Sequence, residues 1–449
     1  MTEMTNTMKP TKEQRIVLSD IASFFGDHEQ DYKIILGAAG TGKSTILKWV
    51  LGMLFRDEKP FYLCAPTGAA SKVMRKKTQH ESRTVHSLIY DTERLKNGLG
   101  VRWVLRTMES KEPSVFIIDE SSMISDMVHS SDRYFSEKPL LTDLITYVKS
   151  GNEKNKIIFI GDRFQLPPSS SEKESPALSV NYLQQKHKLE GSLITLNQVL
   201  RQGEGSYVLD AATALRHSME NSLESPELKL TNLNNATSAI LKYIDLYDIS
   251  NPSKTAIVAW TNKDVNFFNG AIRDRLGLSG NVISSGDQMV MQSAWSNGVD
   301  YIMKGDIVFI NEVSEYEEKF ADLTFRNVSL SYIDSNFETK VVRAKVLVEV
   351  MTSFKGELNL KAEDKLLQEA YKKNPRLRES KNIFDDKYAG ALRLRYGHAL
   401  TCHKAQGSEW ENVILHPYMP LNDLRWQYTA ITRAVKDVYT YPLYLRASA

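Results

Sequence analysis

Cysteine is scarce in this sequence, which contains only Cys64 and Cys402. Two cysteines in apolar or motif-like stretches provide neither a disulfide framework nor the spaced ligands of a zinc site. Long apolar runs are missing as well, since no stretch of about 18 apolar residues exists to span a bilayer. The N-terminus lacks the basic-then-apolar pattern of a signal peptide. The sequence therefore predicts a cytoplasmic protein without disulfides, structural zinc or membrane segments.

An excess of charge of one sign is also lacking, because 57 Lys and Arg residues balance 55 Asp and Glu residues and the formal net charge is +2. Composition alone does not indicate nucleic-acid binding, so any basic surface must be local. The chain has no internal repeat and no long low-complexity tract. Its 449 residues, 42% hydrophobic and 25% charged, are typical of a globular protein with about three domains.

The stretch GAAGTGKS at residues 37–44 fits the phosphate-binding loop pattern G-x-x-x-x-G-K-[ST]. An apolar run precedes it and a helix-favouring run follows, which makes a chance Gly-rich turn the weaker alternative. Glycines let backbone N–H groups converge on phosphate oxygens, and a helix start adds partial positive charge. We expect Lys43 to reach the β- and γ-phosphates and Ser44 to hold Mg²⁺. The nucleotide-binding candidates are Gly37, Ala38, Ala39, Gly40, Thr41, Gly42, Lys43, Ser44 and Thr45.

Polar residues follow two further buried runs. Asp119 and Glu120 come directly after the apolar run 115–118, and Gln165 follows the run 156–160. The carboxyl ends of parallel strands meet at one edge of a sheet, where α/β proteins bind ligands. We therefore expect a carboxylate to face Mg²⁺ and Gln165 to sense the γ-phosphate. A carboxylate that only caps the next helix is the alternative.

A basic segment follows the apolar run 61–65, which ends in Pro66, Thr67 and Gly68. Its members are Lys72, Arg75, Lys76 and Lys77. A strand that ends in a turn at a helix start can hold a phosphate, here one from a polymer backbone. A solvated basic helix face is the alternative.

A hairpin is predicted over residues 91–108, because Asn97-Gly98 separates two extended stretches. Its second arm carries Trp103 between Arg102 and Arg106, so a protruding hairpin would present an aromatic ring between two cations. A plain structural hairpin is the alternative.

The second half of the chain reads as another α/β unit interrupted by β-strands. A strand at 254–259 and a helix at 265–276 begin this unit. Strands without intervening helices are predicted at 289–292, 306–313, 324–333 and 340–350. They indicate a small inserted antiparallel barrel or sandwich, from which a charged helix at 362–373 could project.

Eight blocks occur in one order along the chain: GAAGTGKS, APTGAAS, TVHSL, IIDESSM, GDRFQLPP, LNQVLRQ, HALTCHKAQGSEW and YTAITRA. This series resembles the motifs of superfamily 1 helicases, and most of all their RecD-like branch, which includes small phage DNA helicases. The resemblance extends from Gln14 to Arg433 and is weakest over residues 286–390.

The resemblance implies an α/β fold with two RecA-like parallel-sheet domains. The first would cover 1–195 and carry a β-hairpin insert at about 88–112. The second would cover 196–285 and 392–449, interrupted by an SH3-like β-barrel at 286–391 with a helical projection at about 355–390.

The same resemblance implies roles in ATP hydrolysis. Asp119 would assist Mg²⁺ and Glu120 would orient or deprotonate the attacking water. Gln165 would contact the γ-phosphate, and Arg201 and Arg433 would be arginine fingers from the second domain. Glu409 would contact the ribose and Gln14 the adenine, although an exposed helix glutamine is an equal alternative for Gln14.

For the nucleic-acid strand, the resemblance points to small hydroxyl and backbone donors, which suit phosphates and read no sequence. The positions are Pro66, Thr67, Gly68, His86, Ser87, Thr261, Asn262, Thr401, His403 and Lys404. Hydrogen-bonded structural histidines are the alternative for His86 and His403. The hairpin lies where this branch carries a strand-separating pin, and Trp103 is the hypothesised wedge.

The expected activity is ATP-dependent unwinding of DNA with 5′-to-3′ travel on single strands. An RNA helicase, or a translocase that moves without separating strands, is the alternative. The expected partners are single-stranded DNA, its junctions with duplex and a single-strand-binding or replication protein. A monomer is expected to suffice, in the cytoplasm of a bacterial host if the protein is encoded by a phage.

Overall fold

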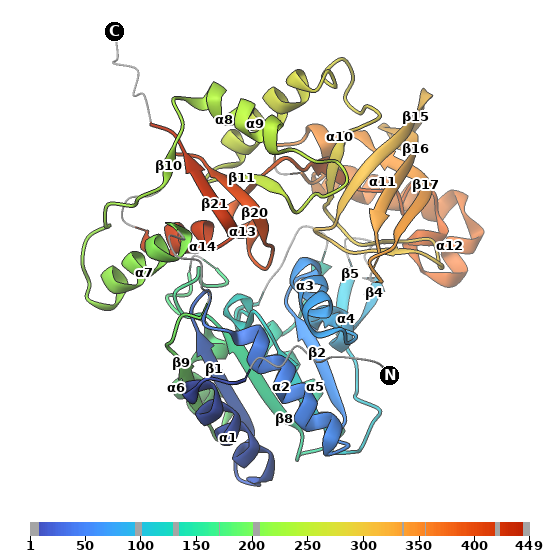
Figure 1. Ribbon diagram of the computed structural model, residues 1–449. Coiled ribbons are helices and arrows are strands. Elements are labelled where there is room, and N and C mark those ends of the chain that lie inside the picture. The colour runs from blue at the N-terminus through green and yellow to red at the C-terminus, as the bar shows by residue number, and fades with distance from the viewer. Residues whose placement is uncertain are drawn as a thin grey trace.

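The structure is a computed structural model that describes residues 9–94, 101–128, 134–169, 171–200, 207–334, 336–354, 356–417 and 423–442. Two parallel sheets and one antiparallel sheet form its three main bodies (Figure 1). The first parallel sheet lies at the bottom of this view and the other two lie above it. Asn97, Gly98 and Arg201 lie outside the described residues.

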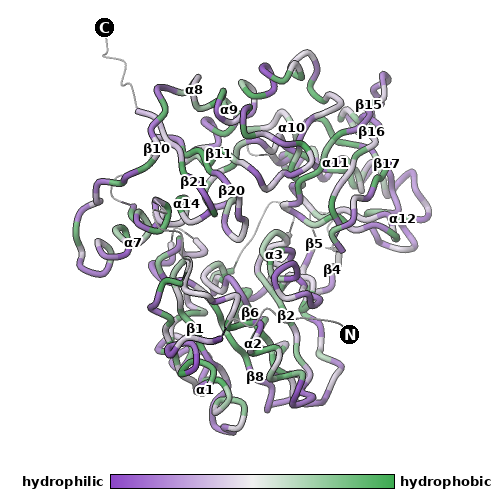
Figure 2. Tube along the Cα trace, viewed as in Figure 1, coloured by the Kyte–Doolittle hydropathy of each residue, from purple (hydrophilic) through white to green (hydrophobic). Residues whose placement is uncertain are grey.

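Six parallel strands form the first sheet in the order β3-β2-β6-β8-β1-β9. They are β1 (Tyr32–Gly37), β2 (Phe61–Ala65), β3 (Arg83–Thr84), β6 (Val115–Ile118), β8 (Lys156–Gly161) and β9 (Gly191–Leu196). β1 and β6 are buried along their whole length. Their near-continuous apolar sequences are those of strands covered on both faces, and Figure 2 shows the hydrophobic residues concentrated along this sheet.

Helices cover both faces of the first sheet. They are α1 (Lys12–Gly26), α2 (Lys43–Arg56), α3 (Gly68–Thr78), α4 (Val85–Ile89), α5 (Leu140–Gly151) and α6 (Val180–His187). Alternate residues of β1 serve opposite faces: Ile35 packs in a core with α1, α2 and α3, and Ile34 packs in a core with α4, α5 and α6. The alternation follows from the period of two along a strand.

The second parallel sheet has the order β10-β21-β20-β11-β19. Its strands are β10 (Thr231–Asn232), β11 (Thr255–Ala259), β19 (Ala399–Thr401), β20 (Trp410–Leu415) and β21 (Ala434–Thr440). Its helices are α7 (Tyr207–Glu220), α8 (Ala236–Leu246), α9 (Asn262–Arg275), α13 (Cys402–Ala405) and α14 (Leu424–Ile431). The expectation of an α/β fold with parallel sheets is confirmed.

The antiparallel sheet interrupts the second parallel domain and has the order β17-β16-β15-β12-β18. Its strands are β12 (Gln288–Met291), β15 (Ile307–Phe320), β16 (Leu323–Ile333), β17 (Thr339–Leu347) and β18 (Leu394–Tyr396). The sheet curls, because Leu392 bridges Val346 at the end of β17. A small hairpin, β13 (Trp295–Ser296) and β14 (Tyr301–Ile302), lies between β12 and β15.

Two boundaries differ from the sequence-based expectation. The strand expected at 340–350 ends at Leu347, where the helix α10 (Val348–Thr352) begins. The second parallel domain does not resume at 392, because β18 pairs with β12 and the parallel sheet resumes only at β19.

The helix expected to project from the insert packs against it instead. α11 (Leu360–Lys373) buries Leu366 completely, in a core that includes Phe325 of β16 and Leu347 of β17. α12 (Pro375–Ser380) follows and buries Leu377. Charged residues on the outer face suggested projection, but the apolar stripe on the inner face needs a partner and finds it in the sheet.

A hairpin is present in the first domain, formed by β4 (Tyr90–Arg94) and β5 (Val101–Leu105). β7 (Tyr134–Phe135) adds a parallel strand beside β5. Within the described part of the chain, no helix combines the length and the apolar character needed to cross a membrane.

Candidate nucleotide and nucleic-acid sites

The loop between β1 and α2 has the backbone of a phosphate cradle. Gly40 and Gly42 have φ of +81° and +87°, which side-chain-bearing residues rarely adopt. A Cβ on Gly37 would lie 2.5 Å from the Thr41 hydroxyl oxygen, so only glycine fits there. Gly42 caps α2 and has no side chain that could bond the amides of the first turn of α2. This is the arrangement that binds anions at helix starts.

Lys43 lies across this loop. Its ammonium donates to the carbonyl oxygens of Gly37 at 2.5 Å and Ala38 at 3.1 Å. Gln14 approaches from α1, where a capping box with Thr11 holds its backbone N–H and amide oxygen. The Gln14 amide nitrogen lies 2.9 Å from where a Cβ of Gly42 would be. Gln14 is thus buried against the loop and is not an exposed helix glutamine.

Two carboxylates follow β6. The Glu120 N–H donates to Asp119 Oδ1 at 2.9 Å, and Glu120 itself has a left-handed φ of +51°. Burial, and secondly the Glu120 carboxylate, raise the pKa of Asp119 to about 6, while Lys43 and Lys77 oppose the shift. Burial makes the Asp119 carboxylate hard to ionise, while the nearby Lys43 favours its ionised form. Such a carboxylate is well suited to binding a divalent cation.

The buried side chain of Gln165 indicates whether the site fits a nucleotide with Mg²⁺. It is 5% exposed, and its Oε1 has no hydrogen-bond partner among the described residues. A buried amide oxygen without a donor is costly. A water beside a γ-phosphate would satisfy it. The cradle, the acids and this orphaned oxygen together fit ATP·Mg²⁺.

The second parallel domain contacts the loop directly. The Tyr428 hydroxyl accepts from the Ala39 N–H at 2.9 Å and donates to Asp162 Oδ2 at 2.6 Å. Thr429 accepts from the Leu166 N–H at 2.8 Å, and the Gln406 amide donates to the Leu166 carbonyl at 3.1 Å. The cleft between the two parallel domains is therefore bridged on both sides of Gln165.

Two residues expected at the nucleotide have other partners in the structure. The Arg433 guanidinium, 4% exposed, donates to the Thr429 and Ser408 carbonyls and to the Thr432 hydroxyl, all in its own domain. Glu409 pairs with Lys77 of α3, at 2.9 Å to each carboxylate oxygen. Arg201 lies outside the described residues, as does any contact it makes.

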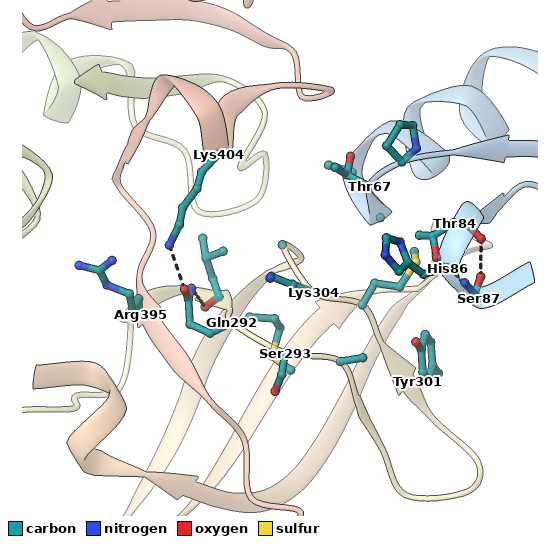
Figure 3. A pocket seen from close by; sticks show the side chains of 18 of the residues that line it. Thr67, Thr84, His86, Ser87, Gln292, Ser293, Tyr301, Lys304, Arg395 and Lys404 are labelled. Atoms are coloured by element: carbon teal, nitrogen blue, oxygen red, sulfur yellow. Dashed lines mark hydrogen bonds between the residues drawn. The ribbon is translucent and has the colours of Figure 1, made fainter. Parts of the chain in front are cut away.

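A groove of about 910 Å³ runs between the first parallel domain and the other two bodies. Ten of the residues expected to bind the strand line it: Pro66, Thr67, Gly68, His86, Ser87, Trp103, Asn262, Thr401, His403 and Lys404. Figure 3 shows Thr67, His86 and Ser87 on one side of this groove and Lys404 on the other. Thr261 does not line it, because it caps α9, accepting from the Asp264 N–H at 3.1 Å.

Trp103 lies inside the groove and not at the tip of the hairpin. It pairs with Thr92 across the strands, partway along the arm. Its ring lies 5.6 Å from those of His86 and Tyr90, and it is partly buried against the core. Trp103 therefore lines the groove wall, and the tip at residues 95–100 lies outside the described part.

Several groove residues were not predicted from the sequence. They include Gln292, Tyr301, Lys304, Tyr371, Lys381, Phe384 and Arg395. All of them come from the antiparallel insert, whose sequence has no motif. Their one common signal is the interleaving of basic and aromatic residues, which by itself does not separate a groove from a solvated surface.

Three basic residues of α3 bond residues of the other two bodies. Lys72 pairs with Asp306 at 2.8 Å and also donates to the Ile333 carbonyl. Arg75 donates to the Asn336 amide oxygen at 2.7 Å. With Lys77 bound to Glu409, α3 contacts both other bodies, a role that neither sequence-based interpretation of this segment included.

Known families match both ends of this architecture. The AAA domain family matches residues 10–229, and the UvrD-like helicase C-terminal domain family matches residues 396–441. The ATP-dependent RecD2 DNA helicase of Deinococcus radiodurans is 25% identical over 408 residues, which are 89% of this chain and 45% of that protein. The chain spans less than half the length of the curated relatives it matches.

Solved structures share the fold over nearly the whole chain. Pif1 helicase from Candida albicans is 15% identical, with a TM-score of 0.51 over 97% of this chain and 95% of that one. Pif1 from Bacteroides in complex with ADP-AlF3 and single-stranded DNA is 16% identical, with a TM-score of 0.51 over 96% and 92%. Fold and site thus define a P-loop protein with a RecA-like parallel-sheet core. In sequence the chain is similar to superfamily 1 helicases of the RecD-like branch.

Proposed function

We propose that this protein is an ATP-driven DNA helicase that travels 5′ to 3′ on single-stranded DNA and separates duplex strands. The groove is the observation that carries the proposal. One wall comes from the first parallel domain and the other from the second parallel and antiparallel sheets. A strand held there contacts both parallel domains, which also form the nucleotide cleft. Closure of the cleft can therefore move one set of strand contacts relative to the other. The DNA helicases among the relatives support DNA as the polymer.

The chemistry follows from the loop and the strand ends. Lys43 and the first-turn amides of α2 bind the phosphates, and Ser44 and Asp119 hold Mg²⁺. Glu120 orients or deprotonates the attacking water, and Gln165 contacts the γ-phosphate. Mg²⁺ held by these residues would offset the negative charge that builds on the phosphate oxygens. Gln14 reads the adenine edge with its amide.

Arg201 and Arg433 are the proposed arginine fingers, a role worth roughly 10³–10⁵ in rate in related phosphoryl transfers. Because Arg433 donates to oxygens of its own domain, this role requires cleft closure to release part of its guanidinium. Glu409 would likewise exchange Lys77 for the ribose.

We also propose that the curled antiparallel sheet is an SH3-like barrel and that the β4–β5 hairpin is the strand-separating pin. One chain then holds both halves of the cleft, so a monomer suffices. The proposed limits are 1–195 for the first domain, with the second domain interrupted from residue 286 until β19 begins at Ala399.

The test is unwinding of fluorescent partial duplexes with a 5′ or a 3′ tail, in DNA and in RNA, with ATP and Mg²⁺. Opening of 5′-tailed DNA alone, lost in Lys43→Ala, is expected. ATP turnover stimulated by single strands without opening of any duplex would overturn the helicase in favour of a translocase. Opening of RNA alone would overturn the assignment of DNA as the polymer.

A further inference from the structure

Three cations from separate elements gather where the groove passes the junction of the second parallel sheet and the antiparallel sheet. Lys404 comes from α13, Arg395 from β18, and Lys304 from the turn between β14 and β15. All three line the groove. Figure 3 shows Lys404 and Lys304 approaching Gln292, with Arg395 on the far side of it.

Neutral oxygens orient two of these cations. The Lys404 ammonium donates to Gln292 Oε1 at 3.1 Å, and the Gln292 amide nitrogen donates to the Val290 carbonyl at 3.0 Å, which fixes its orientation. The Arg395 guanidinium donates to the Asn266 amide oxygen at 2.7 Å. Amide oxygens hold a cation in place without cancelling its charge.

The backbone around Lys304 is fixed from two sides. Gly305 has φ of +89°, and its N–H donates to the Met291 carbonyl at 2.8 Å, which ties the turn to β12. The Lys304 carbonyl lies 3.1 Å from where a Cβ on Gly68 would be, at the start of α3. Lys304 therefore stands between the strand-binding turn of the first domain and Lys404 of the second.

The cations repel one another. The groove walls around Lys404 lower its pKa to about 8, and Arg395 and Lys304 add to the effect, with the Glu357 carboxylate opposing it. Burial likewise lowers the pKa of Arg395. Like charges held together in a groove cost free energy that a bound anion recovers, which is a mark of a binding site more than of a structural ion pair.

The geometry points to a site for a backbone phosphate of the bound strand, formed by Lys304, Arg395 and Lys404. This inference rests on the proposed function and adds to it two phosphate ligands, Lys304 and Arg395, that lie outside the motif series. The ammonium and guanidinium groups that meet there would contact phosphate oxygens, and such contacts read no base. One phosphate bound there would hold the strand to the second parallel sheet and to the antiparallel sheet at the same time.

The test is the salt dependence of binding of fluorescein-labelled dT16 without nucleotide, for the wild type and Lys304→Met. Loss of one phosphate contact should reduce the slope of log K against log[KCl] by roughly 0.7. Affinity at 100 mM KCl should fall about 3- to 10-fold, equally for dT16 and a mixed sequence. Lys304→Arg should restore both. Lys242→Met, which removes a lysine paired with Asp245 on α8, is the matched control.

Equal slopes for the wild type and Lys304→Met, with the wild type binding tightly, would overturn the site and leave the proposed function standing. A wild type that binds no single strand at any salt concentration would instead overturn the proposed function, and this site with it. Melting temperatures within about 2 °C of the wild type would show that Lys304→Met folds, as expected for an exposed position.

Discussion

The Tyr428 hydroxyl donates to Asp162 Oδ2 at 2.6 Å while accepting from the Ala39 N–H at 2.9 Å. One side chain of the second parallel domain thus touches the phosphate loop and the end of β8 at once. Tyr428 is fully buried, and burial raises the pKa of its hydroxyl, so it stays protonated and able to donate.

Tyr428→Phe should weaken the coupling between strand binding in the groove and ATP hydrolysis in the cleft. The change leaves the Asp162 carboxylate short of a donor and the Ala39 N–H without its acceptor, costing about 1.5–3 kcal/mol of domain closure. We expect strand-stimulated kcat for ATP to fall about tenfold or more, with little change in binding of dT16. A steady-state ATPase assay with and without DNA measures both.

Tyr243→Phe is the matched control for this change, because Tyr243 bonds His398 inside the second domain, away from the cleft. If the two variants have the same strand-stimulated kcat, Tyr428 does not couple the domains.

Trp103→Ala should weaken strand binding more than it slows unwinding per ATP. The ring faces the groove beside His86 and Tyr90, and stacking of one base is worth about 1–3 kcal/mol. We therefore expect affinity for dT16 to fall roughly 5- to 150-fold, with Trp103→Phe recovering most of it. A large loss of unwinding per ATP at saturating DNA would instead support the original wedge hypothesis.

The sequence predicted those parts of the site that local chemistry determines. The loop at residues 37–44 and the acids after β6 follow from apolar runs ending in glycines or carboxylates, and both lie where they were expected. The hairpin was found from its turn, but the direction in which Trp103 points depends on packing against Tyr90. Tyr428 and Lys304 were not predicted, because their contacts join residues far apart in sequence, 389 positions in the case of Tyr428 and Ala39. No local pattern encodes a contact at that separation.

Strand affinity should depend on pH through Lys404. With a pKa of about 8, Lys404 is cationic below pH 8 and increasingly neutral above it. A phosphate binds the cation, so affinity for dT16 should fall several-fold between pH 7 and pH 9. Lys404→Arg, which stays charged, should bind with little pH dependence over this range.

The same pKa predicts that the contribution of Lys404 to folding stability increases with pH, whereas strand affinity decreases with pH. The folded pKa of about 8 lies below the ordinary value of 10.5. Between these values the unfolded chain binds more protons, so Lys404 contributes stability that grows as pH rises from 8 to 10.5. Urea titrations of the wild type and Lys404→Met should diverge in this sense. A parallel pH dependence of the two would contradict the assigned pKa.

Asp306→Asn should loosen the antiparallel sheet from the first domain. Lys72 of α3 bonds both Asp306, at 2.8 Å, and the Ile333 carbonyl, and Asp306 also accepts from the Met303 N–H at 2.8 Å. Asp306 is 5% exposed, so removing its charge leaves the Lys72 ammonium in a partly buried contact without its carboxylate. The turn that carries Lys304 is built on this contact, and loosening it lets the groove open. We expect dissociation of dT16 to speed up several-fold in stopped-flow chases, with association less affected.

Lys72→Met should produce a similar change, and the effect of the double variant should be smaller than the sum of the two single effects. Fully additive effects would mean that the two residues act separately and that the contact does not close the groove.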